Sequence, residues 1–216
     1  MNETDLSRLF SHMPILQTPR LTLRRMRSGD CEDMYRYASR SEVTRYLLWE
    51  PHPDRAYTAR YLRMLSGLYR AGQFYDWGVI DRQSEHLIGT CGFSQIDPAN
   101  RCAEIGYVLS PDYWGKGIAA EALTALLNFA FCELKMRRVE AKYMVENTAS
   151  RRVMEKCGMT FEGVLRSKLF VKGLFRDIGV CSILSGEYFA SPRENLYKKC
   201  ESVSLIEKIV RRCSKN

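Results

Sequence analysis

Histidine is scarce in this chain, and paired cysteines are absent. His12, His52 and His86 lie in different parts of the sequence, and none has a second ligand at the spacing of a zinc site. The eight cysteines include no C-x-x-C pair, and several stand inside apolar runs, where a thiol behaves as a small hydrophobic group. We therefore expect no bound metal and eight reduced cysteines.

Long apolar runs, a leader segment and repeats are also missing. No apolar stretch approaches the length of a membrane span, and the first residues, Met-Asn-Glu-Thr-Asp, do not form a basic and apolar leader. We expect a cytoplasmic protein with no membrane partner. The chain has 216 residues, of which 45% are hydrophobic, which is enough for one domain with a substantial core.

The charge balance is basic but not concentrated. Lys and Arg number 33 against 25 Asp and Glu, a formal net charge of +8, which would suit an anionic partner such as nucleic acid or a phosphate-rich cofactor. The basic residues are scattered in pairs such as Arg24-Arg25 and Arg137-Arg138. Scattered charge is typical of a solvated surface. We therefore predict no direct nucleic-acid site.

The first half of the chain reads as a strand, two helices and three further strands. Residues 20–26 alternate as a strand, and Ser28 with Asp30 can cap a helix that runs toward Ala38. Apolar residues at helical spacing predict a helix from Asp54 to Ala71, stopped by Gly72. Three strands joined by short polar turns then form an antiparallel meander, at residues 73–81, 86–96 and 102–110.

The second half is expected to hold a helix from Gly115 to about Leu134, a strand at 138–145, a short helix ended by Gly158, and a final hairpin turning near Lys172-Gly173. We divide the chain into a polar lead-in (1–17), a single domain (18–188) and a basic C-terminal extension (189–216). Apolar residues in that extension predict an amphipathic helix over Leu196 to Arg212.

The segment Gly115-Lys116-Gly117-Ile118-Ala119-Ala120 fits the dinucleotide fingerprint G-x-G-x-x-G/A. A Rossmann domain needs repeated βαβ units, but strand, helix and strand occur once here, and no Lys-Ser or Lys-Thr follows the glycines as in a P-loop. Two interpretations remain. Either the free N–H groups at a helix start bind a pyrophosphate, such as that of coenzyme A, or the glycines are present only because the turn before the helix requires them.

From Thr18 to Tyr188 the sequence resembles the GNAT superfamily of acetyl-CoA-dependent N-acetyltransferases, and within it the RimJ/RimL type that modifies ribosomal-protein N-termini. The segments that carry the resemblance are TPRLTLRRM, LIGTCGF, AEIGYVLSPDYWGKGIAAEAL, ENTASRRVMEKCGM, FEG and FRDIGVCSILSGEY. The resemblance implies an α+β, three-layer fold: a mixed, mostly antiparallel twisted sheet with helices on both faces and a V-shaped splay between two strands.

The resemblance also implies where acetyl-CoA binds. The family's cofactor loop begins with Arg or Gln, whereas this chain has Trp114, so one side-chain contact is lost while the backbone amides remain. The pantetheine arm is expected to pair with one strand and to contact Asn147, and Arg151 and Arg152 are placed to meet the ribose phosphate, although exposed arginines on a short helix are common. The implied cofactor-binding residues are Tyr107, Val108, Leu109, Trp114, Gly115, Lys116, Gly117, Ile118, Ala119, Ala120, Asn147 and Arg152.

Acetyl transfer to an amine needs a neutral nucleophile, a stabilised oxyanion and a proton for the departing thiolate. Glu104 is the candidate base, acting through water; the alternative is a structural ion pair. A backbone N–H near Val108 would meet the oxyanion. Many family members have a tyrosine that protonates the thiolate, but this chain has Met154 at that position, and the RimJ/RimL type also lacks the tyrosine. Ser150 is therefore the candidate hydroxyl near the sulfur. The alternative is that Ser150 only satisfies backbone groups at its own helix start.

Three functions remain open. The leading hypothesis is an enzyme that acetylates a protein N-terminal amine, with a ribosomal protein as the substrate that the resemblance implies. The second is the same chemistry on a small amine such as a polyamine, an amino acid or an antibiotic. The third is a catalytically weak acyl-CoA-binding or ribosome-binding module. The protein is expected to be a monomer or a homodimer.

Overall fold

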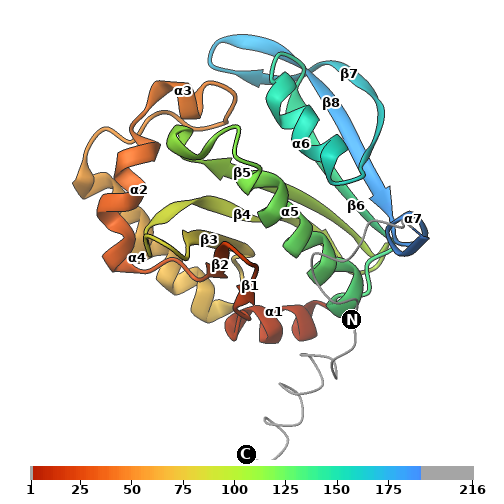
Figure 1. The fold of residues 1–216 in the computed structure, drawn as a ribbon, viewed down its shortest axis with the longest axis horizontal. Helices are drawn as coiled ribbons and strands as arrows, with labels where there is room; N and C mark the ends of the chain where they lie inside the picture. Colours follow the sequence, from red (N-terminus) through yellow and green to blue (C-terminus); the bar gives the residue numbers. More distant parts are fainter. Residues whose placement is uncertain (1, 191–216) are drawn as a thin grey trace, which may run out of the picture.

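The computed structural model describes residues 2–190, which form an eight-stranded sheet with helices packed on it (Figure 1). The strands are β1 (Leu16–Gln17), β2 (Leu21–Arg24), β3 (Asp76–Asp81), β4 (Leu87–Asp97), β5 (Cys102–Leu109), β6 (Arg138–Met144), β7 (Thr160–Val171) and β8 (Leu174–Leu184). Their order is β1-β2-β3-β4-β5-β6-β8-β7. Of the neighbouring strand pairs in this sheet, β5 and β6 alone are parallel, and the other pairs are antiparallel. The mixed, mostly antiparallel sheet expected from the sequence is confirmed.

Helices cover both faces of this sheet. They are α1 (Glu3–Ser11), α2 (Cys31–Ala38), α3 (Ser41–Thr44), α4 (Arg55–Ala71), α5 (Ile118–Asn128), α6 (Thr148–Lys156) and α7 (Ser185–Ala190), with 3-10 turns at Ser28–Asp30 and Pro111–Tyr113 and a π-helical turn at Phe129–Glu133. In Figure 1, α5 and α6 lie in front of the sheet and α4 lies behind it. The core includes the fully buried Trp77 of β3, which packs edge-on against Phe10 and Phe129.

Local signals account for α4 and its predicted ends. The Asp54 carboxylate accepts a 2.6 Å hydrogen bond from the Tyr57 N–H, and Gly72 ends the helix in the left-handed region at φ 65°. The start of α2 differs from the prediction. The Asp30 carboxylate makes no cap bond to α2, because it is held instead by the Arg24 guanidinium at 2.7 and 2.8 Å and by the Arg27 N–H.

The prediction that residues 1–17 are a polar lead-in is wrong. Residues 3–11 form α1, which begins with a reciprocal cap between Asn2 and Asp5. Leu6, Leu9 and Phe10 are buried, since they recur at helical spacing on one side of the helix. The segment therefore contributes to the core. At the other end, the helix predicted over 196–212 lies outside the described residues, as does nearly all of the extension 189–216.

The cysteines mostly behave as expected. Cys31, Cys91, Cys102, Cys157 and Cys181 are free. Cys132 is disulfide-bonded, so the expectation of eight reduced cysteines is wrong at that position. A lone cysteine in an apolar run carries no sequence signal for its partner.

Within residues 2–190, no helix is both long and apolar enough to cross a membrane.

The pairing of β5 with β6 stops halfway along both strands. It runs from Cys102↔Arg138 to Ile105↔Ala141, whereas β5 continues to Leu109 and β6 to Met144. Beyond the last pair the two strands separate, as Figure 1 shows. The predicted splay between these two strands is therefore present, and it determines where the site lies.

Candidate functional site

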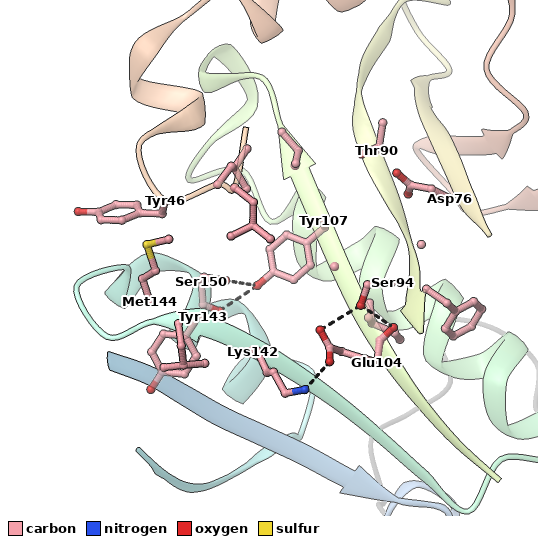
Figure 2. A pocket seen from close by; sticks show the side chains of 18 of the residues that line it. Tyr46, Asp76, Thr90, Ser94, Glu104, Tyr107, Lys142, Tyr143, Met144 and Ser150 are labelled. Atoms are coloured by element: carbon pink, nitrogen blue, oxygen red, sulfur yellow. Dashed lines mark hydrogen bonds and ion pairs between the residues drawn. The ribbon is translucent and has the colours of Figure 1, made fainter. Parts of the chain in front are cut away.

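A cavity of about 710 Å³ opens where β5 and β6 separate. Its walls come from β3, β4, β5, β6, β7, β8, α6, the segment 46–49 that follows α3 and the segment 73–75 that precedes β3. Five residues that the sequence analysis selects lie in its lining, as Figure 2 shows for three of them: Glu104, Tyr107, Val108, Asn147 and Ser150. The predicted glycine loop is not part of this lining.

At the edge of β5 that faces the gap, backbone groups continue past the last residue that pairs with β6. The Ser110 N–H donates to the Ile88 carbonyl, so alternate residues of β5, including Val108, direct their backbone groups toward β4. Tyr107 and Leu109 therefore direct theirs toward the gap, past the last pair with β6 at Ile105. This is an edge along which an extended ligand can pair like a further strand.

Glu104 points into the cavity but is already engaged. Its carboxylate forms an ion pair with Lys142 of β6 and accepts a 3.0 Å hydrogen bond from the Ser94 hydroxyl (Figure 2). Lys142 also contacts Glu140 at 3.1 Å. Although burial lowers the pKa of Lys142, its hydrogen bonds with Glu104 and Glu140 raise it overall. The ion pair that the sequence analysis names as the alternative for Glu104 is thus present.

Ser150 lies at the start of α6, where three groups converge. The Asn147 side-chain oxygen accepts from the Ser150 N–H at 3.2 Å and caps the helix. The Tyr107 hydroxyl donates to the Ser150 carbonyl and lies 2.9 Å from the Ser150 hydroxyl (Figure 2). Since tyrosine has one hydroxyl proton, the Ser150 hydroxyl donates to Tyr107 in this pair. Burial raises the pKa of Tyr107, which keeps it protonated.

The glycine loop forms the start of α5, and both glycines adopt conformations that side chains disfavour. Gly115 has φ 73° and Gly117 has φ 74°. Gly117 is the N-cap of α5 and has no side chain that could accept a hydrogen bond. The first N–H groups of α5, those of Ile118, Ala119 and Ala120, therefore have no side-chain cap. With β5 antiparallel to β4, the loop does not follow a Rossmann-type sheet.

Cationic side chains surround this helix start. A Cβ built on Gly117 would lie 3.7 Å from the Arg20 guanidinium and 3.8 Å from the Lys156 ammonium. Arg20 also donates to the Lys116 carbonyl at 3.0 Å. Arg152 is exposed and lies four residues before Lys156, hence on the same side of α6. The amides and cations together suit a pyrophosphate.

Two predicted residues turn out to have structural contacts. Arg151 is bound to Glu155 at 2.8 Å and stacks on Phe161, whereas the Arg152 side chain is exposed. Trp114, which replaces the family's Arg or Gln, is half exposed, and its indole N–H donates to the Leu109 carbonyl at 2.8 Å. This bond ties the loop to the end of β5.

Three charged residues of the cavity are not selected from the sequence: Lys168, and Asp76 and Lys142, which Figure 2 labels. Asp76 carries a detectable signal, because it is an acidic residue directly before the buried run Trp77 to Ile80 of the same strand. Lys142 carries none, since its contact with Glu104 depends on the register of β5 and β6. Residues 2–190 contain no group of three His, Cys, Asp or Glu side chains placed to hold a metal ion.

Comparison with known families identifies the family of this chain. The family model described as "Acetyltransferase (GNAT) domain" matches residues 20–160, which include the splay, the glycine loop and α6. The chain belongs to the GNAT acetyltransferase family. It is therefore an N-acetyltransferase, and this family uses acetyl-CoA as its acetyl donor.

Relatives of this GNAT chain include proteins with different acceptors. It is 38% identical over 176 residues to "Uncharacterized N-acetyltransferase p20" of Bacillus licheniformis, covering 82% of this chain and 99% of that one. It is 28% identical to "[Ribosomal protein uS5]-alanine N-acetyltransferase" of Escherichia coli, covering 75% and 86%.

Solved structures of similar fold lead to the same family. An acetyltransferase (GNAT family) from Bacillus anthracis superposes with a TM-score of 0.72 at 29% identity, covering 80% of this chain and 99% of the other. Spermidine N-acetyltransferase from Vibrio cholerae, solved in complex with CoA and spermine, superposes with a TM-score of 0.67 at 26% identity, covering 79% and 98%. The fold is thus that of a GNAT enzyme, while the named acceptors range from a ribosomal protein to a polyamine.

Proposed function

We propose that this enzyme transfers the acetyl group of acetyl-CoA to the α-amine at a protein N-terminus, of the ribosomal-protein type. One observation carries the choice of acceptor: the charged side chains that line the cavity are balanced, with Asp76 and Glu104 against Lys142 and Lys168. A polycation such as a polyamine would favour a cavity with an excess of carboxylates. A peptide with one ammonium group suits the balanced lining better.

The residues fit acetyl-CoA, whose thioester supplies an activated acetyl group. The backbone of Tyr107 and Leu109 would pair with the pantetheine arm along the free edge of β5. Because the Asn147 side-chain oxygen caps α6, its amide N–H₂ is the group that remains for a contact with that arm. The N–H groups of Ile118, Ala119 and Ala120 would hold the pyrophosphate beside Arg20, and Arg152 would meet the ribose phosphate.

Proton transfer is divided among groups of the cavity. A primary ammonium has three protons and a secondary amide nitrogen has one, so two protons leave the nitrogen; one ends on the released thiol and the other in solvent. We assign to Glu104 the removal of a proton from the amine through a water molecule. The Ser150 hydroxyl would turn its proton from Tyr107 to the sulfur and donate it to the thiolate, and a proton from solvent would restore the serine hydroxyl. The gap-facing N–H of Tyr107 or Leu109 would meet the oxyanion.

Glu104→Gln is expected to lower kcat about 10²-fold, the low end of the range for a general acid or base, because solvent water reaches an open cavity and replaces part of the relay. The acetyl-CoA affinity should stay unchanged. Glu140→Gln is the matched control: Glu140 lies opposite Glu104 and contacts the same Lys142, but it does not line the cavity. Equal steady-state kcat for wild type and Glu104→Gln would remove Glu104 from the mechanism.

Ser150→Ala is expected to lower kcat about 10-fold or more across the whole pH range, because the hydroxyl that protonates the thiolate is lost. The helix cap should survive, since it uses the Ser150 backbone N–H and the Asn147 side chain. A thermal melt checks that the fold is intact. If Ser150→Ala matches wild type in single-turnover rate, its hydroxyl serves the helix start only.

A panel of acceptors tests the proposed function. We would compare kcat/KM for short peptides that begin with Ser or Ala, the same peptides with a blocked N-terminus, and spermidine. The proposal expects acetylation of the free peptides with at least a 10-fold preference over spermidine, a difference of about 1.4 kcal/mol. A preference for spermidine would make the enzyme a polyamine acetyltransferase. Thermal stabilisation by acetyl-CoA without turnover of any acceptor would favour a binding module.

A further inference from the structure

Asp76, the first residue of β3, presents a carboxylate to the cavity that the mechanism above does not use. It lies on the side of the lining opposite the Glu104–Lys142 pair, next to Thr90 (Figure 2). A Cβ placed on Gly92 would come within 2.5 Å of Asp76 Oδ1. The carboxylate therefore lies over Gly92 of the neighbouring strand, where a larger residue would displace it.

This carboxylate has no counter-ion among residues 2–190. No ion pair in that range involves Asp76, and its Oδ1 is buried without a hydrogen-bond partner. The groups that interact with it electrostatically are hydroxyls and a thiol: Tyr37 of α2, Tyr61 and Tyr69 of α4, and Thr90 and Cys91 of β4. A buried carboxylate oxygen with no donor is costly in a folded protein, which indicates that a ligand supplies the donor.

A trough connects Asp76 to the gap between β5 and β6. Asp76 pairs with Gly92 of β4, and Gly92 pairs with Gly106 of β5, so the three residues face the same side of the sheet in one row. Both glycines lack a side chain, and nothing lies within 4 Å of a Cβ built on Gly106. Because neighbouring strands are about 4.8 Å apart, the row from Asp76 to Gly106 spans about 10 Å. The carboxylate, which leans over Gly92, faces an open path of that length.

We propose that Asp76 binds the ammonium group of the acceptor in this trough and takes the proton that converts it to the nucleophilic amine. The assignment rests on the proposed function, and it names the group that recognises the acceptor. Glu104 is a poorer candidate for this first step, because Lys142 and Ser94 already occupy its carboxylate. Asp76, by contrast, lines the cavity and has an Oδ1 without a hydrogen-bond partner.

The proton balance is complete with this residue. The acceptor ammonium gives one proton to the Asp76 carboxylate, which passes it to solvent through the cavity. The second proton leaves the nitrogen during acyl transfer, through water to Glu104, and the thiolate takes its proton from the Ser150 hydroxyl. The net result is one proton on the thiol and one in solvent. Burial raises the pKa of Asp76 to about 7, despite opposing hydrogen bonds from Thr90 and the Trp77 N–H. A carboxyl group with that pKa can exchange a proton with an α-amine, whose own pKa is about 7.7–8.0.

Asp76→Asn tests the proposal, with Ser- and Ala-starting peptides as acceptors. Wild-type kcat/KM for the peptide should rise with pH through about 7, as the Asp76 carboxyl ionises. In Asp76→Asn we expect kcat/KM to fall about 10- to 100-fold at about pH 6, because the charged hydrogen bond to the acceptor is missing. The rise of kcat/KM with pH should then occur near pH 8, at the pKa of the free α-amine, which is about 7.7–8.0. Asp97→Asn, at the far exposed end of β4, is the matched control and should keep the wild-type profile.

Two further measurements separate this role from a structural one. Because folding raises the pKa of Asp76, its charged form destabilises the folded state, and stability falls as pH rises from about 3.8 to about 7. Asp76→Asn should therefore melt at or above the wild-type temperature at about pH 9, while a structural aspartate would leave a less stable protein. Gly106→Val should fold, since its side chain has free space, yet lower peptide kcat/KM by 10-fold or more by filling the trough.

The outcomes are distinct. A wild-type protein that acetylates no peptide contradicts the proposed function, and the role of Asp76 falls with it. Wild-type activity together with an unchanged pH profile in Asp76→Asn overturns the Asp76 assignment alone. Full peptide activity in Gly106→Val would show that the acceptor does not use the trough, which also overturns it. Acetyl-CoA should raise the melting temperature of all three variants as it does that of wild type, because none of these side chains contacts the glycine loop.

Discussion

Gly117→Val is expected to abolish the rise in melting temperature that acetyl-CoA causes in the wild type. A ligand at about 100 times its Kd stabilises the folded state by about 2.7 kcal/mol, so the wild-type shift is large enough to measure. Valine at position 117 would project toward the space between the Arg20 guanidinium and the Lys156 ammonium, which is the place assigned to the pyrophosphate. The variant should also lose acetyl transfer.

Backbone strain alone could weaken this variant, because Gly117 has φ 74°. Gly173→Val controls for strain: Gly173 has φ 77° and open space around it, but it lies in the hairpin turn between β7 and β8. Both variants should lose about 1–3 kcal/mol of folding stability. Only Gly173→Val should keep the ligand-induced shift. A full shift in Gly117→Val would mean that the glycine loop does not bind the cofactor.

Asp30→Ala is expected to cost about 3–5 kcal/mol of folding stability, measured by urea unfolding. The Asp30 carboxylate accepts two bonds from the Arg24 guanidinium and one from the Arg27 N–H, and the two side chains are only 15% and 9% exposed. A guanidinium is protonated at neutral pH without help from a partner, so Arg24 keeps its charge when the Asp30 carboxylate is removed. A buried, unpaired charge is the source of the loss.

Glu32→Ala is the matched control for this ion pair. Glu32 is also bound by an arginine through two bonds, to Arg55, but both side chains are more than half exposed. Solvent screens such a pair, so its removal should leave stability unchanged within error. Equal losses in the two variants would show that burial does not determine what these ion pairs contribute.

The sequence predicts those elements whose signals are local. The ends of α4 follow from Asp54 and Gly72, the meander follows from strands separated by polar turns, and the final hairpin turns at Lys172-Gly173 as expected. The start of α2 is less well predicted, because the Asp30 carboxylate finds a stronger partner in Arg24 than in the helix N–H groups. Local capping rules do not include a competing guanidinium that arrives from a neighbouring strand.

The site is harder to predict because it depends on register between strands. The glycine loop and Ser150 lie in a continuous sequence pattern, so sequence alone can select them. The Lys142 contact with Glu104 exists only because β5 and β6 are parallel with Glu104 opposite Glu140. Likewise, Asp76 meets an open trough only because two glycines of the next strands fall in its row. Nothing in the spacing of these residues along the chain reveals either arrangement.

The central claim is that the gap between β5 and β6 is an acetyl-transfer site for a free α-amine. The most direct measurement is mass spectrometry of a serine-starting peptide after incubation with the purified chain and isotopically labelled acetyl-CoA. The account predicts one labelled acetyl group, located on the N-terminal nitrogen, with none on the same peptide when its N-terminus is blocked and far less with Asp76→Asn at low pH. Label on a lysine side chain or a hydroxyl, or no label on the peptide at all, would contradict it.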